Sequence, residues 1–162
     1  MNDTVARRIL VIDDEIFIRD LLRDFFSKLN FVVVTAADGN AGVAEYRQSP
    51  FDVVLIDLKM PGKSGIETLR ELHQIQASTP MIVMTGYPTI DSSIAALRLG
   101  ASDYIIKPFK LQELKEVVDR VIKECALHTQ IDSLREKVHT IEEELRQYRS
   151  SATGRTKETA SS

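Results

Sequence analysis

Acidic, hydroxyl and basic side chains directly follow four of the short apolar runs in the sequence. Asp13 and Asp14 follow the first run, Asp57 the third, Thr85 the fourth and Lys107 the fifth. In an open parallel sheet the carboxyl ends of the strands meet at one edge, and ligands bind there where the strand order reverses. We therefore expect these side chains to share one site.

The chemistry of such a site follows from its charges. Three carboxylates in one small pocket repel one another, and at neutral pH raised pKa values or a bound cation must relieve the repulsion. Oxygen-rich sites with few protein ligands suit Mg²⁺, which keeps several waters and shares phosphate oxygens. Lys107 adds a positive charge and Thr85 a hydroxyl donor. Together these groups suit a transferring phosphoryl group, with Asp57 as the nucleophile that forms an acyl-phosphate.

Each of these residues alone has an ordinary structural interpretation. An aspartate after a strand is most often a helix cap or a turn residue, and a Lys-Pro pair is usually a loop. Residues of phosphate or metal chemistry at four strand ends are much harder to explain as caps. The set, rather than any member, carries the prediction.

The elements that must position these residues are indicated by the hydrophobic pattern. Short apolar runs alternate with longer segments of helical period, which is typical of a parallel sheet buried under helices on both faces. We predict an α/β fold, a doubly wound, five-stranded parallel sheet of flavodoxin-like order 2-1-3-4-5, in which the first and third strands are neighbours. The five runs are Ile9–Ile12, Phe31–Thr35, Val53–Ile56, Met81–Met84 and Tyr104–Ile106.

The motifs at the strand ends resemble the receiver domains of two-component response regulators, above all those of the nitrogen-regulation activators. The resemblance covers about residues 6–125. It implies a phosphoacceptor signalling domain rather than an enzyme, with at most slow self-dephosphorylation. Four segments carry it: Val11–Glu15, Asp57–Gly62, Met84–Gly86 and Gly100–Phe109.

The resemblance also implies roles for the acidic residues. Asp57 would be phosphorylated by a histidine kinase or a histidine phosphotransfer protein. Asp14, Asp57 and the backbone carbonyl of Lys59 would bind Mg²⁺, while Asp13 would hold a metal-bound water.

A second group of implied roles concerns switching. Thr85 and Tyr104 match the switch pair of the family, so phosphorylation would draw Thr85 toward the phosphoryl group and turn Tyr104 inward. The bond between Lys107 and Pro108 would be cis. Lys59 and Tyr87 occupy positions that tune the phosphoryl lifetime in the family, although the sequence does not give that lifetime.

The C-terminal region carries a different pattern. Apolar residues alternate at four- and three-residue steps, which predicts that the last helix continues as a coiled coil over residues 126–149 and forms a parallel homodimer. An amphipathic helix that folds back on its own domain, or a solvated stalk, is the alternative. Residues 150–162 lack core residues and are expected to be disordered. The repeating positions are Leu127, Ile131, Leu134, Val138, Ile141, Leu145 and Tyr148.

Composition excludes several other classes of protein. The net charge of -3 and the absence of a basic run argue against direct nucleic-acid binding. Cys125 is the only cysteine, so an internal disulfide is excluded and a reducing, cytoplasmic location is expected. No apolar stretch is long enough for membrane insertion.

Three other functions compete with the phosphorelay. A haloacid-dehalogenase-like phosphatase would need Asp-x-Asp after the first strand, where this chain has Asp13, Asp14 and Glu15. A flavin-binding module would need amides, hydroxyls and glycines at that place, because acids repel a phosphate. A scaffold that works without phosphorylation usually lacks an acid, the Thr or the Lys, and all are present here.

Overall fold

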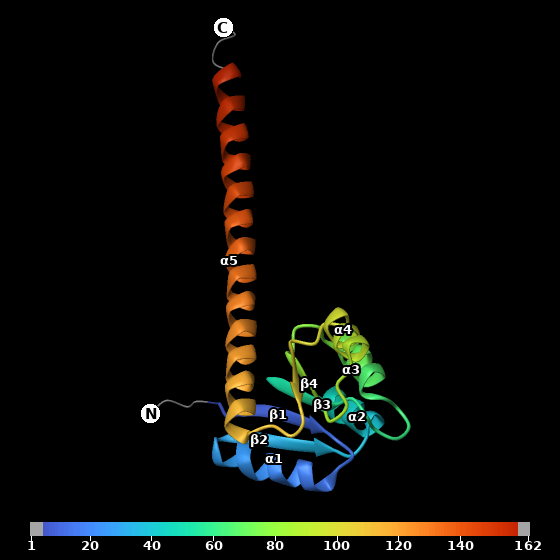
Figure 1. Ribbon diagram of the computed structural model, residues 1–162. Helices are drawn as coiled ribbons and strands as arrows, with labels where there is room; N and C mark the ends of the chain where they lie inside the picture. Colours follow the sequence, from blue (N-terminus) through green and yellow to red (C-terminus); the bar gives the residue numbers. More distant parts are fainter. Residues whose placement is uncertain (1–4, 159–162) are drawn as a thin grey trace. The chain divides into compact units, whose positions relative to one another are not determined.

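Five parallel strands form one sheet in the order β2-β1-β3-β4-β5, which confirms the predicted fold class. The computed structural model describes residues 5–158 of the chain. Helices connect the strands in strict alternation (Figure 1). The elements are β1 (Arg7–Ile12), α1 (Ile16–Lys28), β2 (Phe31–Ala36), α2 (Gly39–Gln48), β3 (Val53–Asp57), α3 (Gly65–Ile75), β4 (Met81–Thr85), α4 (Ile90–Arg98), β5 (Asp103–Ile106) and α5 (Leu111–Glu158).

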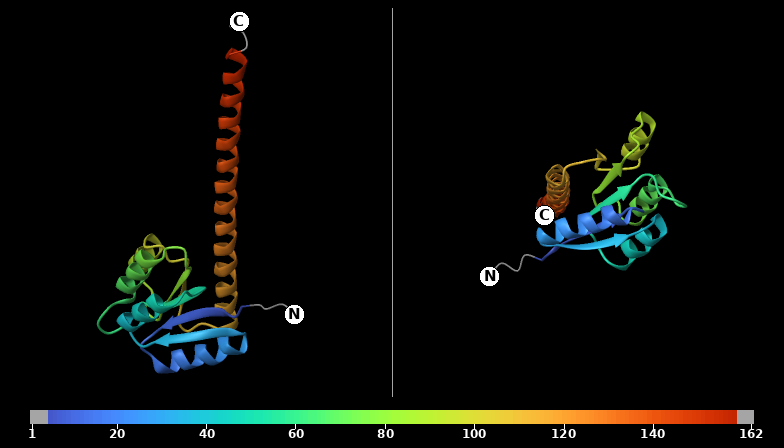
Figure 2. Two further views of the ribbon diagram at one scale, coloured as in Figure 1. Left: turned by 180° about the vertical axis from the view of Figure 1, so that it is seen from behind. Right: turned by 60° about the horizontal axis from the view of Figure 1, so that its bottom comes forward.

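The sheet separates two hydrophobic cores, because successive side chains of a strand point to opposite faces. In β1, Ile9 and Val11 join Leu22 and Phe26 of α1 in one core, together with the first turns of α5. Leu10 and Ile12 face the other core, which α2, α3 and α4 cover. Figures 1 and 2 show α1 on the side of the sheet opposite to α2 and α3. Both faces are therefore covered, as the apolar runs predicted.

The central strands β3 and β4 are buried along their whole length. Their last residues, Asp57 and Thr85, are the polar residues that the sequence placed just after the apolar runs. Burying a carboxylate or a hydroxyl without a partner costs free energy. These strand ends therefore need a local polar network, and the candidate site supplies it.

The loop between β3 and α3 is shaped by a glycine and a helix cap. A Cβ at Gly65 would lie 2.2 Å from the backbone oxygen of Asp57, so only glycine lets the helix start so close to the strand end. Ser64 caps α3 by accepting from the Glu67 amide, and the Glu67 carboxylate accepts from the Ser64 amide in return. The two devices hold the chain just after Asp57 in one position.

The chain divides into two compact units, Met1–Cys125 and Ala126–Ser162. The second unit consists of the later turns of α5, on which the repeating apolar residues are largely exposed, from 44% at Ile131 to 75% at Tyr148. The predicted coiled coil requires a second chain and stays a prediction. Within the described range 5–158, no helix is long and apolar enough to cross a membrane.

The last helix extends further than the apolar pattern indicated. The helix was expected to end near Tyr148, but α5 continues to Glu158, and residues 159–162 of the predicted tail lie outside the described residues. Within the extension, hydroxyl side chains find backbone partners on the helix itself. Ser150 donates to the Arg146 carbonyl at 2.8 Å and Ser151 to the Tyr148 carbonyl at 2.9 Å, so these polar residues bond along the helix.

Candidate functional site

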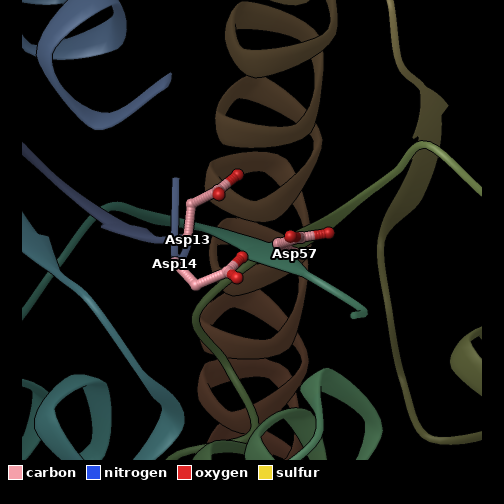
Figure 3. Close-up of side chains that lie close together, drawn as sticks. All are labelled: Asp13, Asp14 and Asp57. Carbon is pink, nitrogen blue, oxygen red and sulfur yellow. The ribbon is translucent and has the colours of Figure 1, made fainter. Parts of the chain in front are cut away.

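Three carboxylates meet at the carboxyl edge of the sheet. Asp13 and Asp14 follow β1, and Asp57 ends the neighbouring strand β3, where Ile12 pairs with Ile56. One oxygen from each carboxylate lies within 4.8 Å of the others, and Figure 3 shows the three side chains gathered at these strand ends. Asp13 and Asp57 are buried, whereas Asp14 is exposed. The structure therefore brings together the three acids that the sequence singled out.

The ammonium group of Lys107 reaches this acidic cluster from the end of β5. Its Nζ lies 2.7 Å from Asp13 Oδ2 and 3.5 Å from Asp57 Oδ2. The Lys107 amide donates to the Thr85 carbonyl at 2.7 Å, and the bond to Pro108 is cis, as the family resemblance implied. A partly buried positive charge thus stands beside two buried negative charges.

Burial and mutual repulsion raise the pKa values of the acids. Desolvation, followed by the charge of Asp13, raises the pKa of Asp57 from 3.8 to about 6, although the charge of Lys107 opposes this. Desolvation also raises the pKa of Asp13. Burial disfavours the charge of Lys107, but its hydrogen bond with Asp13 and the surrounding acids outweigh this and raise its pKa. The site therefore carries more negative charge than its own cation offsets.

The raised pKa of Asp57 predicts a pH-dependent gain in stability for Asp57→Asn. The folded protein holds a proton on Asp57 that the unfolded chain has lost, so the free energy of unfolding falls as pH rises from about 4 to about 6. A shift from 3.8 to about 6 corresponds to about 3 kcal/mol. Without divalent cations, Asp57→Asn should be more stable than wild type by up to that amount above about pH 6, with little difference near pH 4.

Urea unfolding at several pH values, with EDTA present, measures this difference. The control is Asp20→Asn, which makes the same change at a side chain that is 60% exposed on α1. A stability difference between Asp57→Asn and wild type that did not change with pH would contradict the prediction.

Thr85 ends β4, the strand next to β3, and Lys59 follows Asp57 by two residues. Thr85 is 1% exposed, and its hydroxyl oxygen accepts from the Tyr87 amide at 3.1 Å. In the same way, the Lys59 amide donates to Asp57 Oδ1 at 3.4 Å. The Lys59 ammonium then lies 4.1 Å from the centre of the Tyr87 ring. A cation–π pair therefore joins the loops after β3 and β4.

Tyr104, the other predicted switch residue, lies on β5 next to Val83 of β4. It is half-buried, and its hydroxyl oxygen is 3.2 Å from Ser92 Oγ of α4. The ring thus connects β5 to α4. Its role as a switch residue stays a prediction.

The donor set fits a hard divalent cation. Carboxylate oxygens from three side chains converge, and Mg²⁺ prefers oxygen ligands with part of its water shell retained. A cation there would also relieve the repulsion that raises the pKa of Asp57.

Two side chains that contact the cluster were not assigned a role from the sequence. The Glu15 carboxylate lies 3.3 Å from the Lys107 ammonium. The Arg19 guanidinium donates to the backbone carbonyl of Asp13 at 2.8 Å. Glu15 is next to the paired acids and could have been suspected. Arg19 gives no such signal, because its partner is a backbone atom.

The chain belongs to the response regulator receiver domain family, whose pattern matches residues 9–119. The resemblance inferred from the strand-end motifs is therefore confirmed. Receiver domains are signalling domains of two-component systems and typically bind Mg²⁺ at an acidic pocket, and the structure contains such a cluster of acids.

Individual relatives support the assignment. The chain is 36% identical over 137 residues to the regulatory protein AtoC of Escherichia coli, covering 85% of this chain and 30% of AtoC. It is 34% identical over 119 residues to the chemotaxis protein CheY of Bacillus subtilis, covering 73% of this chain and 99% of CheY. A crystal structure of NtrX from Brucella abortus matches with a TM-score of 0.76 and 30% identity, covering 80% of this chain and 30% of NtrX. The chain thus spans less than a third of AtoC and of NtrX.

Proposed function

We propose that Asp57 accepts a phosphoryl group from a phosphohistidine on a histidine kinase or a histidine phosphotransfer protein. One observation carries this proposal. The Lys107 ammonium lies within 3.5 Å of both Asp13 and Asp57, at the edge where three carboxylates converge. Such a constellation suits charge neutralisation around a phosphoryl group. A structural ion pair would need only one acid for one lysine. The convergence of three acids beside Lys107 therefore supports a phosphoacceptor site better than a structural ion pair.

The transfer step follows from these roles. A carboxylate oxygen of Asp57 attacks phosphorus, the bond from phosphorus to the histidine nitrogen breaks, and that nitrogen keeps the electron pair. Bound Mg²⁺ would neutralise charge on the phosphoryl oxygens. Asp14, Asp57 and the Lys59 carbonyl would hold the ion, and Asp13 would hold one of its waters. Because Asp57 must be unprotonated to attack, a bound cation that lowers its pKa also prepares it for transfer.

Two residues would convert the new phosphoryl group into a surface change. Thr85 would donate its hydroxyl proton to a phosphoryl oxygen, since its oxygen already accepts from the Tyr87 amide and its proton is available for donation. Tyr104 would turn inward when Thr85 moves, and would give up its contact with Ser92. The surface formed by α4 and β5 would change for a downstream partner.

Phosphorylation by acetyl phosphate tests the proposed function. The intact mass of the full chain should increase by one phosphoryl group when acetyl phosphate and Mg²⁺ are present, and the gain should be absent with EDTA. A chain that never gains mass would support the scaffold that works without phosphorylation. Turnover of many phosphate esters per chain would support a phosphatase.

We also propose that this chain forms a parallel homodimer through residues 126–149. The apolar residues of this region share one stripe and are about half exposed, from Ile131 at 44% to Leu134 at 58% in its first part. In a parallel pair, Lys137 would face Glu142 of the second copy and Glu144 would face Arg149, so both flanking contacts attract. The occupant that fits the stripe is therefore a second copy of this chain.

Two aspartates in the stripe should abolish the dimer. Ile131→Asp with Val138→Asp would place charges at the centre of the seam, and burying unpaired carboxylates is costly. Light scattering should show wild type at twice the monomer mass and the double variant at the monomer mass. Asp132→Asn with His139→Gln, off the stripe on the same turns, is the control. A double variant that stays dimeric would refute the proposed interface.

We further propose that the protein is cytoplasmic and does not contact nucleic acid directly. Both proposals are supported by the net charge of -3 and by the single cysteine.

A further inference from the structure

The two acids after β1 are held very differently. Every polar group of Asp13 has a partner. Its amide donates to the Ala36 carbonyl at 3.1 Å, its Oδ1 accepts from the Glu15 amide at 2.9 Å, and its Oδ2 accepts from Lys107 at 2.7 Å. The Asp14 carboxylate, in contrast, is exposed and makes no hydrogen bond or ion pair with any residue in the described range 5–158. Its direction therefore depends on the backbone that carries it.

The peptide group between Asp13 and Asp14 sets that direction. Rotation of this peptide would swing the Asp14 side chain relative to Asp57, because the peptide plane links the two residues. One side chain restrains the plane. The half-buried Arg19 guanidinium donates to its carbonyl oxygen at 2.8 Å, from the second turn of α1. The Arg19 amide also donates to the Glu15 carbonyl at 3.1 Å, which ties the same loop to the helix.

We propose that Arg19 is a positioning residue for divalent-cation binding, in that it fixes the peptide that aims Asp14 at the cation. This inference rests on the proposed Mg²⁺ site. It assigns to Arg19 a function in metal affinity, not in the transfer of the phosphoryl group. Residues that orient metal ligands typically account for about 10- to 100-fold in affinity.

The sign of the effect separates positioning from charge. Removing a positive charge near an acidic cluster favours a bound cation, since like charges repel. If Arg19 acted only through its charge, replacing it by a neutral residue would therefore strengthen Mg²⁺ binding by the protein. If Arg19 positions Asp14, the same replacement would weaken Mg²⁺ binding by the protein. Arg23, one turn further along α1, provides the matched control, because it pairs with Asp20 at 3.3 Å and contacts Thr35 instead of the loop after β1.

Calorimetric titration of the full chain with MgCl₂ tests the inference. Arg19→Met should weaken Mg²⁺ binding by about tenfold or more, and Arg23→Met should leave it unchanged or slightly stronger. Arg19→Lys, which can still donate to the carbonyl, should recover part of the affinity. Under saturating Mg²⁺, Arg19→Met should reach the wild-type maximal rate of phosphorylation by acetyl phosphate, so that only the Mg²⁺ concentration for half-maximal rate increases.

The possible failures are distinguishable. If wild type binds no Mg²⁺, the proposed metal site is wrong. If wild type binds Mg²⁺ and Arg19→Met binds it equally or more tightly, the positioning role is overturned and the proposed function stands. A fall in maximal rate at saturating Mg²⁺, with the half-maximal concentration unchanged, would also overturn it, because the guanidinium would then act on the chemistry or on the fold.

Discussion

Asp57→Asn is expected to abolish phosphoryl uptake from acetyl phosphate. Asparagine matches the shape of aspartate, so the strand end and its 3.4 Å contact with the Lys59 amide can persist. The amide cannot act as the carboxylate nucleophile that forms an acyl-phosphate. Intact-mass measurement after incubation with Mg²⁺ should therefore detect a phosphoryl group on wild type and none on Asp57→Asn. The loss is expected to be complete and not a reduced rate, because no other acid in the cluster occupies the same strand end.

The surface variant Asp20→Asn serves as the control, and it should be phosphorylated like wild type. Phosphoryl uptake by Asp57→Asn at the wild-type level would assign the acceptor to another residue. Asp13 or Asp14 would then be the candidates, because their oxygens lie within 4.8 Å of the Asp57 carboxylate. Without divalent cations, Asp57→Asn is expected to be more stable than wild type at neutral pH, so an unfolded protein would not explain its loss of uptake. Function and stability thus move in opposite directions at this position.

The fold was predictable because its signals are local and repeated. Buried parallel strands read as continuous apolar runs, and the runs that became β3 and β4 are buried from end to end. The observed strands differ from the predicted runs mainly at their ends. The structure extends β3 to Asp57 and β4 to Thr85, since backbone pairing continues to the residues that begin the site.

The convergence of the acids was predictable for a topological reason. Residues that follow neighbouring parallel strands lie at the carboxyl edge of the sheet, whatever their side-chain type. Arg19 and Gly65 could not be assigned in this way. In each case the deciding neighbour is a backbone atom. Arg19 donates to the Asp13 carbonyl, and Gly65 leaves free the space in which a Cβ would meet the Asp57 carbonyl oxygen, and the hydrophobic pattern reveals neither contact. The extent of α5 was also missed, because the end of the helix was inferred from its apolar periodicity, which stops at Tyr148, whereas the backbone of α5 stays helical to Glu158.

Lys107→Met is expected to distinguish the contribution of the Lys107 ammonium from that of Mg²⁺, the two positive charges that the proposed mechanism requires. Methionine keeps most of the length of the lysine stem but removes the ammonium that lies 3.5 Å from Asp57. Loss of one such charge-stabilising group typically costs about 10²- to 10³-fold in rate. We therefore expect phosphorylation by acetyl phosphate to slow by about that factor, with the mass gain still appearing after long incubation.

Mg²⁺ affinity should change in the opposite direction in the same variant. The ammonium competes with Mg²⁺ for the charge of Asp13 and Asp57, and its removal leaves two buried acids without their cation. Calorimetric titration should therefore give tighter Mg²⁺ binding for Lys107→Met than for wild type, while Lys110→Met, which removes an exposed charge from the same loop, should match wild type in both measurements. Weaker Mg²⁺ binding by Lys107→Met would mean that the lysine builds the metal site instead of opposing the metal. Uptake at the wild-type rate would mean that Lys107 only neutralises the resting acids and has no part in transfer.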